Sequence, residues 1–183
     1  NAQSQKKCTL FATFLNAVKK KGIKKIEGNI VGDASLYAEE GSPGIWLVED
    51  IGSAYSPTPS ALSFYDNLLT FTMQTDNSAA KVSHVSPNCK LFRPQLDIEV
   101  AKGNVYSKWA KSDYSWTPTV KGRLAPNSKH GIRMEISEPA LFVADSMLST
   151  LQKAGITVTG NITTQRVLRS TEPRKTLATY KSE

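Results

Sequence analysis

A serine and a lysine three residues apart form the first pattern in this sequence with a clear chemical meaning. A lysine one helical turn beyond a serine can take the proton of the hydroxyl and prepare it for attack on a carbonyl carbon. The spacing occurs at Ser4 with Lys7 and at Ser78 with Lys81. Ser4 lies in a polar N-terminal stretch, Ser78 follows turn residues and precedes a β pattern, and about two such matches are expected by chance. We therefore predict that neither serine is a nucleophile.

The other motifs of serine acyl transfer are incomplete in this chain. Proline occupies the middle of Ser86-Pro87-Asn88, and Leu177 follows Lys175-Thr176 where a Lys-Thr-Gly strand requires glycine. The sequence also has no Gly-x-Ser-x-Gly elbow, phosphate-binding loop or His-Glu-x-x-His motif. We predict that the chain carries no catalytic residues of its own.

An acidic pair, Glu49 and Asp50, lies within residues 37–59, which are rich in Gly, Pro and Ser and include Trp46 and Tyr55. A long ordered loop of this kind in a compact domain is often functional. A carboxylate beside aromatic rings can hold a cationic ligand group through charge and apolar contact together. A solvated loop acid or a helix N-cap is the alternative, because aspartate favours both positions.

Metal-ligating side chains are too few for a zinc site, which needs about four ligands at close spacing. The sequence supplies only Cys8, Cys89, His84 and His130, with no Cys-x-x-Cys pair. We predict no metal and no cofactor. The even cysteine number permits one disulfide in an exported protein, and two free, buried thiols are the other interpretation.

The net charge of +7 comes most densely from five lysines near the end of the first expected helix: Lys19, Lys20, Lys21, Lys24 and Lys25. Lysines in a last helical turn complement the helix dipole, whereas a nucleic-acid groove more often mixes arginine with aromatic residues. We expect a solvated face and no nucleic-acid partner, with contact to a polyanion as the alternative.

No apolar run approaches the roughly 20 residues of a membrane span, so no transmembrane segment is predicted.

A short sequence motif occurs twice and indicates how the elements of the chain are arranged. Gly22-Ile23 is followed four residues later by Gly28-Asn29-Ile30, and Gly155-Ile156 is followed three residues later by Gly160-Asn161-Ile162. Each copy comes after apolar residues at helical spacing and opens a β pattern, with glycine as the helix stop. The expected helices cover residues 9–21 and 140–153, and the first β pattern covers residues 25–31.

The long segment between the two copies is predicted to form short strands without a helix, apart from a turn or short helix expected over residues 60–67. The strands are expected over residues 68–74, 82–85, 96–100, 114–120 and 132–136. The sequence predicts a mixed α/β (α+β) fold in which two helix–strand units surround a sheet. These units form a discontinuous α/β domain, residues 1–75 and 138–183, which is interrupted by an inserted β-rich subdomain, residues 76–137.

The order of residues from Gly22 to Asn67 resembles the penicillin-binding D-alanyl-D-alanine carboxypeptidases of the penicillin-binding protein 4 type. Members of that family carry Gly-Ile at a helix end, a Gly-Asn-hydrophobic strand, Asp-x-Ser-x-aromatic, Pro-Gly-Trp, paired acids, an aromatic residue, Ser-Ala-Leu and Asp-Asn. The matching residues here are Gly22-Ile23, Gly28-Asn29-Ile30, Asp33-Ala34-Ser35-Leu36-Tyr37, Pro43-Gly44-Ile45-Trp46, Glu49-Asp50-Ile51, Tyr55, Ser60-Ala61-Leu62 and Asp66-Asn67. Ile45 interrupts Pro-Gly-Trp, and Val48 stands where many members have a second Trp.

The resemblance implies where the missing chemistry lies. In the family, Ser-x-x-Lys precedes the first Gly-Ile unit, and Ser-x-Asn and Lys-Thr-Gly follow the second. We therefore expect this chain, which begins at Asn1 without methionine, to be the non-catalytic segment of a longer exported protein of the periplasm or cell envelope. The loop acid and aromatic residue that border the family's substrate cleft map onto Asp50 and Tyr55.

By the same resemblance, the full-length protein would acylate its serine with the D-Ala-D-Ala end of a peptidoglycan stem peptide, release D-alanine and hydrolyse the acyl-enzyme. β-Lactams and the catalytic domain would be its other partners. The alternative is a non-enzymatic envelope-binding module with the same fold.

Overall fold

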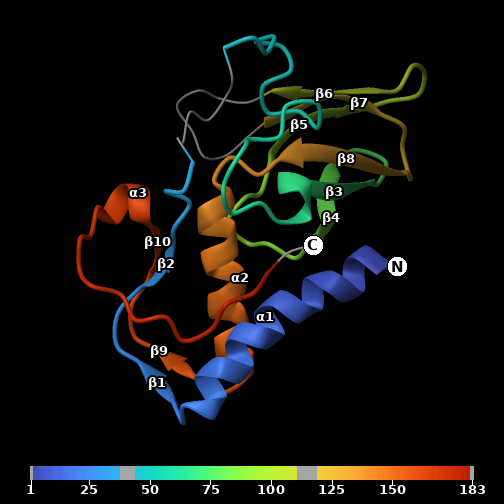
Figure 1. The fold of residues 1–183 in the computed structure, drawn as a ribbon. Helices are drawn as coiled ribbons and strands as arrows, with labels where there is room; N and C mark the ends of the chain where they lie inside the picture. Colours follow the sequence, from blue (N-terminus) through green and yellow to red (C-terminus); the bar gives the residue numbers. More distant parts are fainter. Residues whose placement is uncertain (1, 38–43, 111–118, 182–183) are drawn as a thin grey trace.

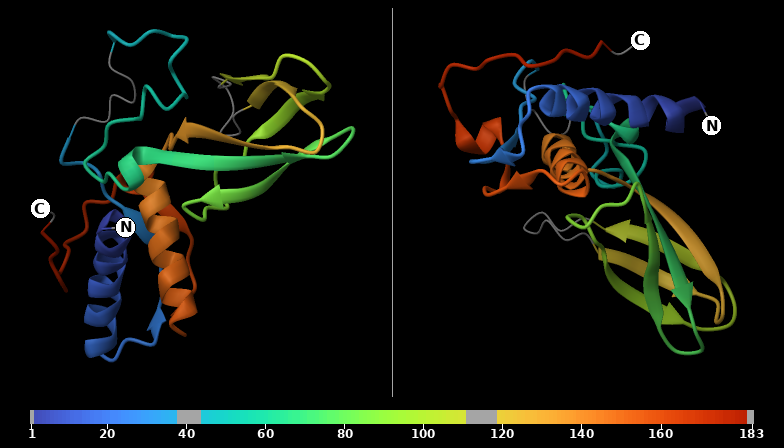
Figure 2. Two further views of the ribbon diagram at one scale, coloured as in Figure 1. Left: turned by 90° about the vertical axis from the view of Figure 1, so that its right-hand side faces the viewer. Right: turned by 90° about the horizontal axis from the view of Figure 1, so that it is seen from below.

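The two copies of the Gly-Asn-Ile phrase lie side by side in the computed structural model, which describes residues 2–37, 44–110 and 119–181 (Figure 1). In chain order the elements are α1 (Ala2–Lys20), β1 (Lys25–Ile26), β2 (Ile30–Gly32), the 3₁₀ turn η1 (Tyr65–Asn67), β3 (Leu68–Thr75), β4 (Ala80–Ser86), β5 (Gln95–Val100), β6 (Tyr106–Ala110), β7 (Thr119–Leu124), β8 (Lys129–Glu135), α2 (Pro139–Lys153), β9 (Thr157–Val158), β10 (Ile162–Thr164) and α3 (Gln165–Leu168). Both long helices run in the same direction, and α2 packs on the paired strands (Figure 2). Within the described ranges no helix is long and apolar enough to cross a membrane.

The two copies pair in parallel at a constant offset of 132 residues. Lys25 lies opposite Thr157 in the β1–β9 pair, and Ile30 lies opposite Ile162 in the β2–β10 pair. The Asn161 N–H donates to Asn29 Oδ1 at 2.9 Å, so the asparagine of the first copy caps the backbone of the second. The additional residue of the first copy falls before its strand, where it does not disturb the register.

Two glycines permit close backbone approach at this pairing. A Cβ atom on Gly160 would lie 2.7 Å from the Asn29 nitrogen and closer still to the Gly28 carbonyl. A Cβ atom on Gly32 would lie 2.7 Å from the carbonyl carbon of Ala140, in the first turn of α2. The contacts between the two strands, and between β2 and α2, are therefore backbone against backbone, and any side chain at these positions would force them apart.

Several predicted boundaries differ from the structure. The strand expected over residues 25–31 is two strands, β1 and β2, because Gly28 interrupts it at a φ of +128°. α1 begins at Ala2 rather than at residue 9, since residues 2–8 favour helix through Ala, Gln and Lys without an apolar stripe. The strand expected over residues 114–120 falls mostly outside the described residues, and β7 begins at Thr119.

Strands β3 to β8 form two three-stranded sheets, which we call the β lobe. β3 pairs antiparallel with β4 and β8, and β7 pairs parallel with β5 and antiparallel with β6. Met73 of the first sheet is buried with Val120 and Leu124 of the second, so the sheets pack face to face through apolar side chains. The predicted mixed α/β class is confirmed, and the partition into residues 1–75 with 138–183 and residues 76–137 remains a proposal.

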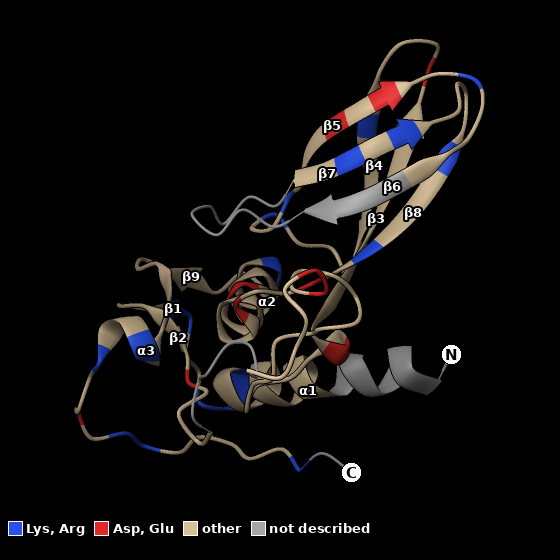
Figure 3. Ribbon diagram, turned by 90° about the horizontal axis from the view of Figure 1, so that it is seen from above, with Lys and Arg blue, Asp and Glu red and all other residues tan. Residues whose placement is uncertain are grey.

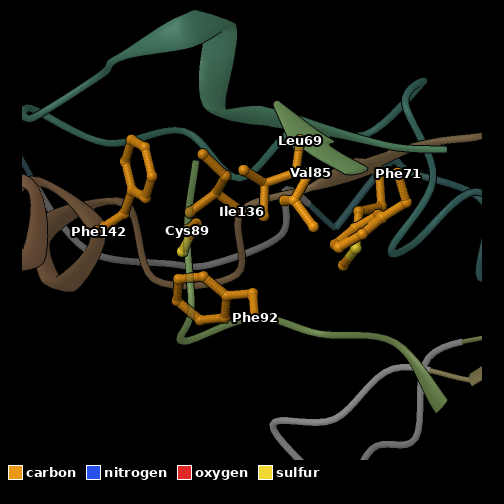
Figure 4. Close-up of a cluster of buried hydrophobic side chains, with 8 residues drawn as sticks. Leu69, Phe71, Val85, Cys89, Phe92, Ile136 and Phe142 are labelled. Carbon is orange, nitrogen blue, oxygen red and sulfur yellow. The ribbon is translucent and has the colours of Figure 1, made fainter. Parts of the chain in front are cut away.

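A second apolar cluster joins the β lobe to α2 (Figure 4). Leu69 and Phe71 of β3 and Phe142 of α2 belong to this cluster, and all three are buried. Cys89 lies in the same cluster as a free thiol, and burial raises its pKa. The free-thiol alternative is therefore correct for Cys89, whereas the side chain of Cys8 lies outside the described residues.

The close approach at Gly160 generates a stability prediction. Replacing Gly160 by Ala should lower the free energy of unfolding by about 1–3 kcal/mol, because the new methyl group meets rigid backbone rather than a movable side chain. At Gly131 in β8, an added methyl group would meet nothing within 4 Å, so Gly131→Ala is a matched control with an effect within about 0.5 kcal/mol. Urea unfolding of both variants measures the difference. Equal midpoints would show that the two strands can separate without cost.

Candidate functional site

The loop that carries the predicted ligand contacts is fastened to the edge of β8. Gly52 O accepts a hydrogen bond from the Glu135 N–H at 3.3 Å, and Ser53 forms an antiparallel bridge with Met134. Thr58 Oγ1 donates to Glu135 Oε2 at 2.9 Å. These contacts bind the loop to a strand of the β lobe through both backbone and side chain.

Asp50 sits in a tight turn within this loop. Its N–H donates to Leu47 O at 3.0 Å, and its carbonyl accepts hydrogen bonds from the Ser53 N–H and the Ser56 hydroxyl. The Asp50 side chain is partly buried, and among the described residues no hydrogen bond or ion pair joins its carboxylate. The backbone around Asp50 is thus held by hydrogen bonds within the described part of the loop.

Tyr55 lies five residues further along the same loop. Its N–H donates to Ser53 Oγ at 3.1 Å, and its side chain is 86% exposed. Other apolar side chains of the loop are also exposed, namely Ile45, Leu47 and Val48. The structure places Asp50 and Tyr55 in the same loop, and Pro43 of the family-like motif lies outside the described residues.

A buried polar network beneath the loop was not found from the sequence. Glu135, Thr58 and Asn67 are 1%, 8% and 4% exposed. Asn67 Nδ2 donates to Thr58 O at 2.8 Å and to Ser63 Oγ at 3.1 Å, and Asn67 Oδ1 accepts from the Phe64 N–H at 3.0 Å. Buried polar groups of this kind are retained only when their hydrogen bonds are satisfied. The Asp-Asn pair of the family-like motif was the available signal for Asn67.

The same asparagine ends a left-handed turn. Tyr65, Asp66 and Asn67 have φ values of 57°, 56° and 52°, a conformation that costs an L residue roughly 1–2 kcal/mol. The hydrogen bonds of Asn67 offset this cost, as does aromatic packing on both sides of the turn. Phe64 contacts Phe11 of α1 with ring centroids 5.0 Å apart, and Tyr65 contacts Phe142 of α2 at 6.4 Å. The turn therefore joins the loop to both helices.

The serine–lysine pairs predicted to be non-catalytic belong to elements other than this loop. Ser78 lies in the turn between β3 and β4, where its N–H donates to Asp76 Oδ1 at 2.8 Å and its hydroxyl lies 3.3 Å from the same oxygen. These bonds, with that from Ala79, hold the pKa of the Asp76 carboxyl below its usual value. Ser4 and Lys7 lie in α1, where their side chains are outside the described residues. Over the described parts of the chain, no three potential metal-ligating side chains come together.

An ion pair marks the start of the loop. Asp33 follows β2, and its carboxylate is paired with Arg174 of the C-terminal segment and accepts the Ser35 N–H at 3.0 Å. Hydrogen bonds from Ser35 and Arg174 lower the pKa of Asp33 to about 2. The Asp-x-Ser motif thus fixes where the loop leaves β2 and ties the C-terminal segment to that point.

Comparison with known proteins identifies the class and the family. The solved structure of penicillin binding protein 4 (dacB) from Haemophilus influenzae has the same fold, with a TM-score of 0.69 and 19% identity over 92% of this chain and 37% of that chain. The same protein complexed with a novel β-lactam gives a TM-score of 0.57 and 18% identity over 92% of this chain and 35% of that chain. No curated protein sequence matches significantly. The fold is therefore one found within a penicillin-binding protein, and the chain spans little more than a third of those solved chains.

The family model of the D-Ala-D-Ala carboxypeptidase 3 (S13) family matches residues 4–183. The chain belongs to this family, which confirms the resemblance found from the Gly22–Asn67 motifs.

The Asp33 pair generates a pH-dependent prediction. Because the folded-state pKa of Asp33 is about 2 and its ordinary value is 3.8, its stabilising contribution is present above about pH 5 and is lost as the pH falls toward 2. Asp33→Asn should cost about 1 kcal/mol at pH 7, a value reduced by solvent around the pair. The difference in free energy of unfolding between Asp33→Asn and the unmodified chain should vanish near pH 2.

Chemical unfolding at several pH values measures this effect. Asp97→Asn is the matched control, because Asp97 pairs with Lys121 at 3.4 Å on the open surface of the β lobe. A pH-independent loss in Asp33→Asn would assign the effect to packing rather than to the ionised carboxylate.

Proposed function

We propose that this chain is the non-catalytic part of a serine-type D-Ala-D-Ala carboxypeptidase or endopeptidase that acts on peptidoglycan stem peptides in the periplasm or cell envelope. The observation that carries the proposal is the match of the S13 family model to residues 4–183. The incomplete Ser-x-Asn and Lys-Thr-Gly motifs support it, because they indicate that the acylating serine belongs to a part of the protein outside this chain.

In the proposed reaction the serine oxygen, supplied from outside this chain, attacks the carbonyl carbon between the two D-alanines. The peptide C–N bond breaks, the terminal D-alanine leaves with the serine proton, and water then hydrolyses the ester. A β-lactam would acylate the same serine. Asp50 and Tyr55 have no part in these bond changes, and in the proposal they position the stem peptide.

The role proposed for Asp50 rests on its charge and surroundings. A peptidoglycan stem peptide that carries a free amino group on its side chain presents a cation to the cleft. The partly buried Asp50 carboxylate, which no described residue pairs, can accept a charge-assisted hydrogen bond from that ammonium group, and the exposed ring of Tyr55 can cover its methylene groups.

A fluorescent β-lactam tests whether the acylating serine lies outside this chain. The full-length protein should be labelled covalently at one serine, and the isolated 183-residue chain should remain unlabelled in a denaturing gel. A full-length protein that is never labelled would support the alternative of a non-enzymatic envelope-binding module. Labelling of the isolated chain at Ser78 would instead show that the catalytic apparatus lies within it.

A substitution in the full-length protein tests Asp50. Asp50→Asn should lower kcat/KM about 10- to 100-fold for a stem peptide with a free side-chain amine, the amount expected for loss of one charged hydrogen bond. A peptide whose amine is acetylated should be turned over equally by both proteins. Glu49→Gln, at the exposed neighbouring acid, is the matched control and should change neither rate. Equal losses on both peptides would assign Asp50 a structural role only.

A further inference from the structure

A group of exposed lysines gathers where the two long helices end. We call this group the lysine face; its members are Lys19, Lys20, Lys21, Lys24, Lys25 and Lys153, and all six are exposed. Lys19 and Lys20 are in the last turn of α1, Lys153 is in the last turn of α2, and the others follow α1. Both helices end at the same end of the molecule, next to the β1–β9 pair, and the loop that carries Asp50 lies at the opposite end (Figures 1 and 2).

The charge of the lysine face is largely uncompensated within the described chain. Lys25 pairs with Glu27 at 2.5 Å, but no ion pair joins the other five lysines to an acid among the described residues. Two basic residues of the β lobe differ from these five lysines, because Lys121 and Arg123 of β7 pair with Asp97 and Glu99 of β5 (Figure 3). Favourable interaction with the helix dipoles explains why lysines occupy the last turns of α1 and α2. It does not explain Lys21 or Lys24, which lie beyond the end of α1.

An exposed apolar side chain adjoins these charges. Leu177 is 46% exposed and lines a shallow hollow with Ala17, Lys20 and Lys21. Among the described residues, no arginine or aromatic side chain lines this hollow, and these are the groups that fork onto phosphates or stack on bases in nucleic-acid grooves. Compact ammonium groups on flexible stems around an exposed leucine are suited to a layer of lipid headgroups, where each lysine close to an anionic membrane strengthens binding roughly fivefold.

We propose that the lysine face is a docking surface for an anionic phospholipid bilayer. Several lysines act together there through their summed charge, and Leu177 enters the headgroup layer. Because the lysine face lies at the far end of the helices from the Asp50 loop, the bilayer can be bound while that loop remains accessible. The proposal does not depend on the catalytic role of the full-length protein.

Vesicle co-sedimentation of the 183-residue chain tests the proposal. Vesicles in which about a third of the lipid is phosphatidylglycerol and the rest phosphatidylcholine should bind the chain, and pure phosphatidylcholine vesicles should not. Raising the ionic strength from about 0.05 to 0.5 M should release it, since exposed charges are screened. Binding that is insensitive to lipid charge would overturn the proposal.

Two triple variants with the same change in net charge provide the decisive comparison. Lys20→Gln with Lys21→Gln and Lys24→Gln should weaken binding about 100-fold. Lys81→Gln with Lys102→Gln and Lys129→Gln, all at exposed positions of the β lobe, should weaken it less than about threefold by the general charge effect alone. Both should unfold at the same urea concentration as the unmodified chain. Equal weakening by the two variants would overturn the proposal.

A final arm distinguishes lipid from other polyanions. Replacement of Leu177 by Ser should weaken vesicle binding severalfold without altering retention on heparin or single-stranded DNA. Tighter binding to DNA than to the vesicles at equal salt, with no effect of the Leu177 substitution, would refute the lipid assignment. The lysine face would then be a nucleic-acid-binding surface.

Discussion

Parallel pairing of Gly28-Asn29-Ile30 with Gly160-Asn161-Ile162 is the interaction on which the rest of the structure depends. Parallel strands require a crossover between them, and here the crossover includes the whole β lobe and α2. Closing so long a connection costs little more than closing a short one, because loop entropy grows only with the logarithm of length, about 0.6 kcal/mol for each doubling. The β lobe can therefore occupy the crossover while the two asparagines keep the register.

The loop with Asp50 is positioned by the end of β8, a strand that lies within this crossover. Glu135 ends β8, and Thr58 and Asn67 hold the loop and the left-handed turn against it by buried hydrogen bonds. The unfavourable conformation of three consecutive non-glycine residues is stabilised by rings from both helices. The described part of this loop, residues 44–59, is thus fixed relative to the helices and the β lobe at once, which suits a segment proposed to position a substrate.

The two proposed activities of the chain use opposite ends of the molecule. The Asp50 loop presents a carboxylate and exposed apolar side chains, whereas the lysine face presents cations beside Leu177. Their separation along the helices means that each surface can be occupied without displacing the other (Figure 2). Membership of the S13 family gives the first surface its proposed substrate, and the second is proposed from charge and exposure alone.

The sequence by itself determined the mixed α/β class, the two helix–strand units and the family, because helical spacing, glycine stops and ordered motifs are local signals. It also located the loop with Asp50 and Tyr55. Only the tertiary structure decided that the two units pair with each other, that Gly28 divides the first strand, and that Glu135 is buried. Glu135 continues the exposed alternation of Gly131 and Arg133 along β8, and it becomes buried only because a loop distant in sequence covers it. Contacts of that kind depend on where remote segments meet, which no local pattern of residues specifies.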